Sequence, residues 1–295
     1  MKMGQYIDNK NITLWIERRP APGPTCLLVG GAGAIAAFWP DSFCDALHRA
    51  GFQVIRYDHR DTGLSTFVDF DRDPYGLMDL LDDALTILDH VGVQSAHWVG
   101  HSMGGFVAQL AAIHHPERVL SLTSMSSHAA HPDLPSPSAE TWKVMLANQP
   151  RGDIRRDLPG FMTVWRYLNG SVPFDEGAAA AYTRELYRRN PKTLPATNHV
   201  AIQADMADRT PDLERLDLPA LIVHGEADPL VPMVGGTLTA EAIPNARFLS
   251  LPDVGHMFFN GKIWETLAKH IIETMRHRRA LPAMGAQKAK DDHEA

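Results

Sequence analysis

The chain has 295 residues, of which 44% are hydrophobic and 21% are charged. This composition is typical of a globular protein and excludes a mainly disordered chain. The sequence carries 28 Lys and Arg against 35 Asp and Glu, which gives a formal net charge of −7. Nucleic acids bind to basic surfaces, so an acidic chain of this kind is not expected to have a nucleic-acid partner.

No segment of the sequence resembles a secretion signal or a membrane span. The first ten residues contain no apolar run, and the longest charge-free stretch, residues 20–40, is interrupted by prolines and glycines. Cys26 and Cys44 are the two cysteines, too few for a disulfide framework or, alone, for a zinc site. We therefore expect a cytoplasmic protein with two buried thiols and no membrane partner.

The N-terminal third alternates between predicted strands and helices. Residues 12–16 alternate apolar and polar side chains, as in a half-exposed antiparallel strand, whereas the apolar runs 25–29 and 52–57 predict buried strands. A helix is expected over residues 41–50, with Pro40 in its first turn. Leucines and alanines at helical spacing predict another helix over 77–88, which Gly92 ends.

The same alternation continues further along the chain, with a long interruption. We expect strands at the segments 96–99, 119–123, 220–223 and 248–251, a helix over 103–114, and a last helix over 264–272. Alternating strands and helices predict an α/β fold with a mostly parallel sheet covered by helices on both faces.

The interruption predicts a helical cap inserted into the sheet domain. Residues 131–210 open with three prolines and continue with helical, aromatic-rich patterns. We assign 1–130 and 211–282 to the sheet core and 131–210 to the cap. The polar tail, residues 283–295, is expected to be disordered.

The strongest motif in the sequence lies where the predicted strand 96–99 meets the following helix. The residues Gly100-His101-Ser102-Met103-Gly104 match the pattern G-x-S-x-G. This pattern is typical of the nucleophile elbow, a tight turn that carries a serine between a strand and a helix. The elbow exposes the serine hydroxyl, and the free N–H groups of the helix start point at it. Ser102 is thus the candidate nucleophile.

A serine needs a base to take its proton and an acid to orient that base. Asp228 follows the predicted strand 220–223 and His256 follows 248–251, in the chain order serine, acid, histidine. All three residues fall at carboxyl ends of strands, where open α/β sheets bind ligands. Glu226 is a rival acid, and Asp253 a second acid near the base; we prefer Asp228 and His256.

Acyl transfer also needs N–H donors for the developing oxyanion. The backbone N–H of Met103 is the first candidate, and the glycine-rich loop after strand 25–29 supplies the second. In that loop we favour Ala32, with Gly31 and Gly33 as alternatives. The substrate pocket is expected to be formed by Gly31, His101, Met125, Trp142, Trp165 and Met257.

Parts of the sequence also fit a dinucleotide-binding site or a metal site. The loop also fits the dinucleotide pattern G-x-G-x-x-A, with Asp58 at the end of the next strand as a possible ribose acceptor. Pro40 would interrupt the long helix that such a site requires, so this alternative ranks lower. His128 and His131, with Asp133 nearby, lack a further ligand cluster, so no metal or cofactor is expected.

The sequence resembles the α/β-hydrolase superfamily over nearly its whole core. The segment after strand 52–57 is similar to that superfamily's D-x-R-G-x-G-x-S loop, and its HRDTG form, followed by Pro74-Tyr75-Gly76, resembles the aclacinomycin methylesterase group. The resemblance implies Ser102 as nucleophile, Asp228 as acid, His256 as base, and oxyanion donors at Met103 and near Ala32.

The sequence therefore predicts a serine carboxylesterase that acts through an acyl-enzyme on a small apolar or aromatic ester. Lactone, thioester or carbon–carbon bond hydrolysis and perhydrolysis are alternatives on the same three residues. A non-catalytic small-molecule receptor with the same fold is an alternative of another class.

Overall fold

The computed structural model describes residues 2–189, 197–203 and 206–277. Its strands are β1 (Met3–Asn9), β2 (Ile12–Arg19), β3 (Thr25–Val29), β4 (Gln53–Asp58), β5 (Ala96–His101), β6 (Val119–Met125), β7 (Ala220–Gly225) and β8 (Arg247–Leu251). Its α-helices are α1 (Asp41–Arg49), α2 (Leu77–His90), α3 (Met103–His114), α4 (Ala139–Ala147), α5 (Ile154–Leu168), α6 (Glu176–Arg189), α7 (Thr197–Ala201), α8 (Thr210–Leu213), α9 (Met233–Ala242) and α10 (Gly261–Arg276). Two short 3-10 helices are η1 (Ala36–Phe38) and η2 (Pro116–Arg118).

The strands form one eight-stranded sheet in the order β1-β2-β4-β3-β5-β6-β7-β8. From β4 to β8 all neighbours are parallel, whereas β2 is antiparallel to both β1 and β4. This arrangement confirms the predicted α/β class and the predicted antiparallel strand at 12–16. The strand β1 was not predicted; it carries few apolar residues and forms as the partner of β2.

Helices cover the sheet on both faces and bury one apolar cluster on each. The helices α1 and α10 pack together on one face, and α2 packs on α3 on the other. The central β3 strand supplies both clusters, because its alternate residues point to opposite faces: Leu27 and Val29 to one, Cys26 and Leu28 to the other.

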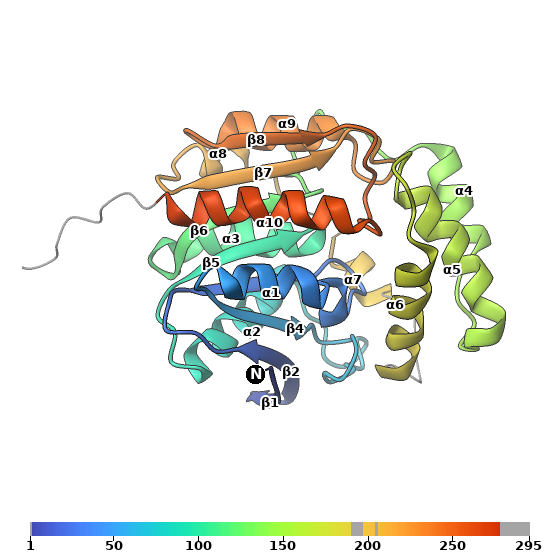
Figure 1. The fold of residues 1–295 in the computed structure, drawn as a ribbon, viewed down its shortest axis with the longest axis horizontal. Helices are drawn as coiled ribbons and strands as arrows, with labels where there is room; N and C mark the ends of the chain where they lie inside the picture. The colour runs from blue at the N-terminus through green and yellow to red at the C-terminus, as the bar shows by residue number, and fades with distance from the viewer. Residues whose placement is uncertain (1, 190–196, 204–205, 278–295) are drawn as a thin grey trace, which may run out of the picture.

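The helices α4–α7, which we call the cap helices, lie between β6 and β7 in the chain. In Figure 1 the arrowheads of β4, β5 and β7 point toward α4, α5 and α6, which stand at that end of the sheet. The carboxyl ends of the parallel strands therefore face the cap helices. The exact cap boundaries, 131–210, stay a prediction, and the tail 283–295 lies outside the described residues.

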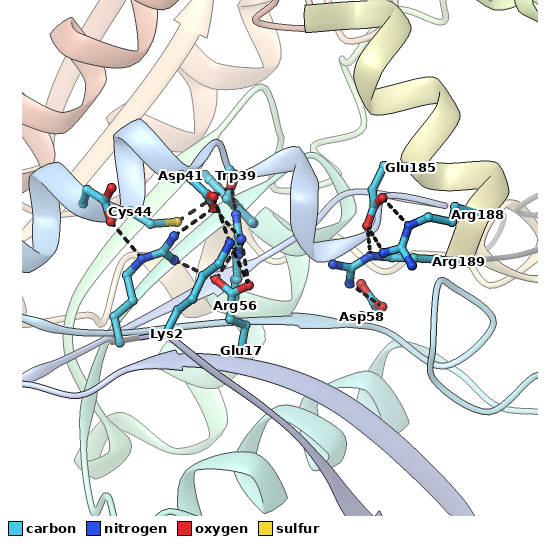
Figure 2. A network of polar contacts seen from close by, with 12 residues as sticks. Lys2, Glu17, Trp39, Asp41, Cys44, Arg56, Asp58, Glu185, Arg188 and Arg189 are labelled. Carbon is cyan, nitrogen blue, oxygen red and sulfur yellow. Dashed lines mark hydrogen bonds and ion pairs between the residues drawn. The ribbon is translucent and has the colours of Figure 1, made fainter.

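A network of ion pairs, in which Glu17, Arg19 and Arg56 are buried, ties the antiparallel edge to α1. Arg56 on β4 lies 2.7 Å from Glu17 on β2 and 2.6 Å from Asp41 at the start of α1. Arg19 contacts the same two carboxylates at 2.8 Å each. The left part of Figure 2 shows Arg56 between Glu17 and Asp41. Removing the buried carboxylate of Glu17 would leave buried arginines without their buried partner, and breaking a buried ion pair in this way costs about 3–5 kcal/mol.

Within the described ranges, no helix is long and apolar enough to cross a membrane. The same residues contain no group of three or more His, Cys, Asp or Glu side chains arranged to hold a metal ion.

Candidate active site

Ser102 occupies a strained turn between β5 and α3. Its backbone has φ +53° and ψ −121°, which costs a non-glycine residue about 1–3 kcal/mol. The turn is held in place because the Ser102 N–H donates to the carbonyl of Met125, at the end of β6, over 2.8 Å. The side chain is partly exposed, whereas its neighbours His101 and Met103 are buried.

The glycines of the motif are required by close backbone contacts. A Cβ on Gly100 would lie 2.1 Å from the carbonyl oxygen of Gly104, and one on Gly104 would lie 2.1 Å from that of Val29. Any side chain at either position would therefore push α3 away from the sheet and displace Ser102.

Asp228 and His256 meet at the carboxyl ends of β7 and β8. His256 Nδ1 donates to Asp228 Oδ2 over 2.8 Å, and both residues are buried. The other carboxylate oxygen accepts the N–H groups of Leu230 and Val231 at 2.9 and 2.8 Å. Since the carboxylate fixes the proton on Nδ1, the Nε2 lone pair of His256 is left to act as a base.

The surroundings of Asp228 favour its ionised form. Burial alone would raise the pKa of the carboxyl, but the adjacent His256, its hydrogen bond and the nearby His224 outweigh burial, and the pKa is lowered. His224 lies 3.6 Å from Asp228 and donates from Nε2 to the carbonyl of Val231 at 2.8 Å. Sequence reasoning did not single out His224.

The rival acids lie elsewhere. Glu226 accepts a hydrogen bond from Ser250 Oγ at 2.7 Å, on an exposed part of the sheet edge. Asp253 has φ +62°, and its carbonyl accepts from the N–H of Ser171 in the cap segment. Of the acids considered from the sequence, Asp228 is the one hydrogen-bonded to His256.

His101 connects the elbow to the segment that carries His256 between β8 and α10, residues 252–260, which we call the histidine loop. Its Nε2 donates to the carbonyl of His256 over 2.9 Å, and the two rings lie 4.9 Å apart. Burial lowers the pKa of His101 to about 3, so the ring stays neutral. On its other side, a Cβ on Gly31 would lie 3.1 Å from His101 and 3.2 Å from the Ser102 Cβ. Ser102, the histidine loop and the glycine-rich loop thus pack around one ring.

The remaining predicted pocket residues have different environments. Met125 and Met257 are buried in the apolar cluster beside α10, and Trp165 packs against Phe259 with ring centroids 5.7 Å apart. Trp142, on α4, is 46% exposed. Their contact with substrate stays a prediction.

In the glycine-rich loop, the N–H groups of Ala32 and Gly33 differ in their hydrogen bonding. Gly33 N–H donates to Nδ1 of His199, on α7, over 3.0 Å. Ala32 is exposed, and its N–H has no hydrogen-bond partner among the residues that the structure describes. Met103 N–H begins α3, where a helix leaves its first amides without an intrahelical acceptor. These contacts favour Ala32 over Gly33 as the second oxyanion donor.

The contacts of Asp58 disfavour the dinucleotide alternative. Its two carboxylate oxygens accept the N–H groups of Ala36 at 2.6 Å and Leu64 at 2.9 Å. Arg189, at the end of α6, completes a buried ion pair with it at 3.3 Å, shown at the right of Figure 2. Asp58 is fully buried and holds two loops together, so it is not open to a ribose. The helix predicted to begin at residue 41 is α1, and the loop before it contains only the short 3-10 helix η1. The long helix that a dinucleotide site requires does not begin at the glycines.

Asn169, at the end of α5, joins the cap helices to the histidine loop. Its Oδ1 accepts the N–H of Phe259 at 3.1 Å, and its Nδ2 donates to the carbonyl of Val172 at 3.0 Å. Backbone bonds run beside it, from Gly255 N–H to the Asn169 carbonyl at 3.1 Å and from Met257 N–H to Leu168 at 2.9 Å. Sequence reasoning missed this residue because nothing in its local pattern marks it.

Replacing Asn169 with alanine is expected to lower the free energy of unfolding by about 2–4 kcal/mol. The fully buried amide would leave the N–H of Phe259 and the carbonyl of Val172 without partners, at roughly 1–3 kcal/mol for each such group. Urea unfolding measures the change. Gln149→Ala, which removes an exposed amide on the end of α4, is the control; equal losses in both variants would contradict the assignment.

Comparisons with known proteins place this geometry in a family. A family model described as "alpha/beta hydrolase fold" matches residues 24–262. Rhodomycin D methylesterase DauP of Streptomyces sp. (strain C5) is 36% identical over 276 residues, covering 85% of this chain and 91% of the relative. DnrP of Streptomyces peucetius, also a rhodomycin D methylesterase, matches with the same identity and coverage.

More distant relatives have the same fold. Putative carbamate hydrolase RutD of Azorhizobium caulinodans is 31% identical, covering 86% of this chain and 91% of the relative. A hydrolase structure from Pseudomonas aeruginosa PA01 superposes with a TM-score of 0.72 at 25% identity, over 92% of this chain and 98% of the other. The chain therefore belongs to the α/β hydrolase family and is an enzyme of the esterase type.

Proposed function

We propose that the protein is a serine carboxylesterase in which Ser102, His256 and Asp228 act as nucleophile, base and orienting acid. The observation that carries the proposal is the 2.8 Å bond between His256 and Asp228 at the strand ends, beside the strained Ser102 elbow. A buried carboxylate hydrogen-bonded to an imidazole, next to such an elbow, is the arrangement that acyl transfer requires.

The reaction proceeds in two halves. Ser102 Oγ attacks the ester carbonyl while His256 Nε2 takes its proton, and Asp228 stabilises the imidazolium that forms. The negative carbonyl oxygen is stabilised by the N–H groups of Met103 and Ala32. His256 then gives its proton to the departing alcohol. Water attacks the acyl-enzyme by the same steps and releases the acid, with no metal or cofactor required.

The substrate is proposed to be an ester of an aromatic or otherwise apolar acid with a small alcohol, methanol above all. Two relatives named rhodomycin D methylesterase support the methyl ester. Aromatic side chains of the cap support an apolar acid part: Trp165 packs against Phe161, Tyr182 and Phe259 at 5.5–6.1 Å between ring centroids. A site lined by such aromatic side chains would bind apolar ligands and use few polar groups for orientation.

A panel of methyl esters tests the substrate class. We expect kcat/KM for aromatic methyl esters to exceed that for methyl esters of multiply charged acids at least tenfold, about 1.4 kcal/mol in transition-state binding. Released methanol is measured by gas chromatography. Thioesters of the same aromatic acids, aromatic lactones and methyl N-aryl carbamates form the second arm. A preference for charged esters, or for any of these other groups, would overturn the substrate assignment.

A further inference from the structure

His199, on the short helix α7, is a buried histidine that the proposed reaction does not use. Each of its two ring nitrogens contacts a backbone group of the core, at positions that are distant from His199 in the sequence. Gly33 N–H donates to Nδ1 over 3.0 Å, and Nε2 lies 2.9 Å from the carbonyl of Arg60. The ring is fully buried. It therefore joins the glycine-rich loop to the segment that follows β4.

The two contacts fix the tautomer of His199. The Arg60 carbonyl can only accept, so Nε2 carries the proton, and the Gly33 N–H can only donate, so Nδ1 offers its lone pair. Burial lowers the pKa of the ring to about 4, with Asp61 and the Arg60 carbonyl opposing, so the imidazole is neutral at pH 7. A neutral ring in this orientation is a permanent acceptor for Gly33.

The Gly33 N–H belongs to the central peptide of a tight turn. Ala34 N–H donates to the Gly31 carbonyl over 3.1 Å, and Gly33 has φ +68°, while Ala32 is not among the residues with positive φ. This is the geometry of a type II turn, with Ala32 and Gly33 as its middle residues. Rotation of the peptide between them converts the turn to type I, a change that a glycine-rich loop opposes only weakly. The rotation moves the Ala32 carbonyl and the Gly33 N–H, and it removes a restraint on the preceding peptide, which carries the Ala32 N–H.

A second imidazole holds the start of the same loop. His59 Nε2 donates to the carbonyl of Gly30 over 3.1 Å, and its ring lies 5.9 Å from that of His199. The loop is therefore fixed at Gly30 and at Gly33. Between these points lie Gly31, packed on Ser102, and Ala32, whose N–H faces no described acceptor.

We propose that His199 is a positioning residue that locks the Gly31–Ala34 turn and so holds the Ala32 N–H as an oxyanion donor. The inference rests on the proposed serine esterase function. Preorganised donors stabilise the transition state because they need no reorientation when charge develops. A residue of a cap helix thereby completes a part of the active site that the core holds at Gly30 but not at Gly33.

Two substitutions separate the two hydrogen bonds of His199. In His199→Asn the side-chain oxygen takes the place of Nδ1 and still accepts from Gly33. In His199→Gln the side-chain nitrogen takes the place of Nε2 and still donates to Arg60, but the acceptor is lost. We expect the Gln variant to lose about tenfold to a hundredfold in kcat with KM within threefold, and the Asn variant to stay within threefold of the parent.

Asn198→Ala is the matched control for docking of α7. Asn198 Nδ2 donates to Asp61 at 2.9 Å, so its removal weakens the attachment of the same helix without touching Gly33. We expect kcat within threefold of the parent. A control that loses as much as the Gln variant, a Gln variant of full activity, or equal losses in the Asn and Gln variants would each overturn the proposal.

A measurement that does not depend on turnover distinguishes failure of this proposal from failure of the esterase assignment. Hydrogen exchange of the Gly33 amide, followed by NMR, should accelerate at least tenfold in the Gln variant and not in the Asn variant. Unchanged exchange would refute the role of His199 even in an active esterase. Absence of ester hydrolysis by the parent protein across the panel would instead refute the esterase assignment.

Discussion

Replacing Ser102 with alanine is expected to reduce kcat by roughly 10⁴–10⁶-fold, because no other group can form the acyl-enzyme. The residual rate reflects the oxyanion donors and substrate binding alone. Hydrolysis of an aromatic methyl ester measures the loss. Intact mass after treatment with a fluorophosphonate provides a second readout: the parent protein should gain one adduct, mapped to Ser102 by peptide sequencing, and the variant none.

Ser126 offers a matched control for this experiment. It also has a positive φ, +46°, at the end of the neighbouring strand β6, and its N–H donates to the carbonyl of Val223 at 2.9 Å, as that of Ser102 does to Met125. Ser126→Ala should keep activity within threefold of the parent. Full ester hydrolysis by Ser102→Ala would remove the basis of the proposed mechanism and favour the receptor alternative if ligand affinity were unchanged.

Asp228→Asn is expected to lower kcat by about 10⁴-fold without unfolding the protein. The backbone N–H groups of Leu230 and Val231 hold one oxygen of the side chain, so the new amide group faces His256 Nδ1. It then donates to Nδ1, which moves the imidazole proton to Nε2. His256 in that tautomer cannot accept the proton of Ser102. Steady-state kinetics and circular dichroism together measure the effect.

Glu226→Gln is the matched control for Asp228→Asn, because both changes convert an acid in the same loop to its amide. Glu226 contacts Ser250 rather than His256, so kcat should change by less than threefold. If Glu226→Gln produced the larger loss, the identity of the orienting acid would have to be reversed.

Much of the architecture follows from local patterns in the sequence. Buried parallel strands appear as continuous apolar runs, so β3, β4 and β5 were predicted close to their observed bounds. The elbow was predictable because its glycines are imposed by backbone contacts a few residues apart, as at Gly100 and Gly104. The pairing of Asp228 with His256 was expected because both follow strands that end at the same edge of the sheet.

Contacts between distant segments were not predictable in this way. His199 and Gly33 are separated by 166 positions, and Asn169 and Phe259 by 90, and in both pairs one partner is a backbone N–H that any residue carries. Helix α9 is a different case: Gly235 and Gly236 lower its intrinsic helix propensity, and a Cβ on Gly236 would lie 2.4 Å from the His224 ring. Tertiary packing there overrides local preference.

The joint between the cap segment and the histidine loop has a consequence for recombination between relatives. Gly170 forms a β-bridge with Val254, and a Cβ on it would lie 2.3 Å from the carbonyl oxygen of Asp253. A chimera that exchanges only the insertion between β6 and β7 would place a foreign turn against an unaltered histidine loop. The module that can be transplanted intact therefore consists of two pieces, the insertion and the segment around residues 253–259, even though β7, α9 and β8 separate them in the chain.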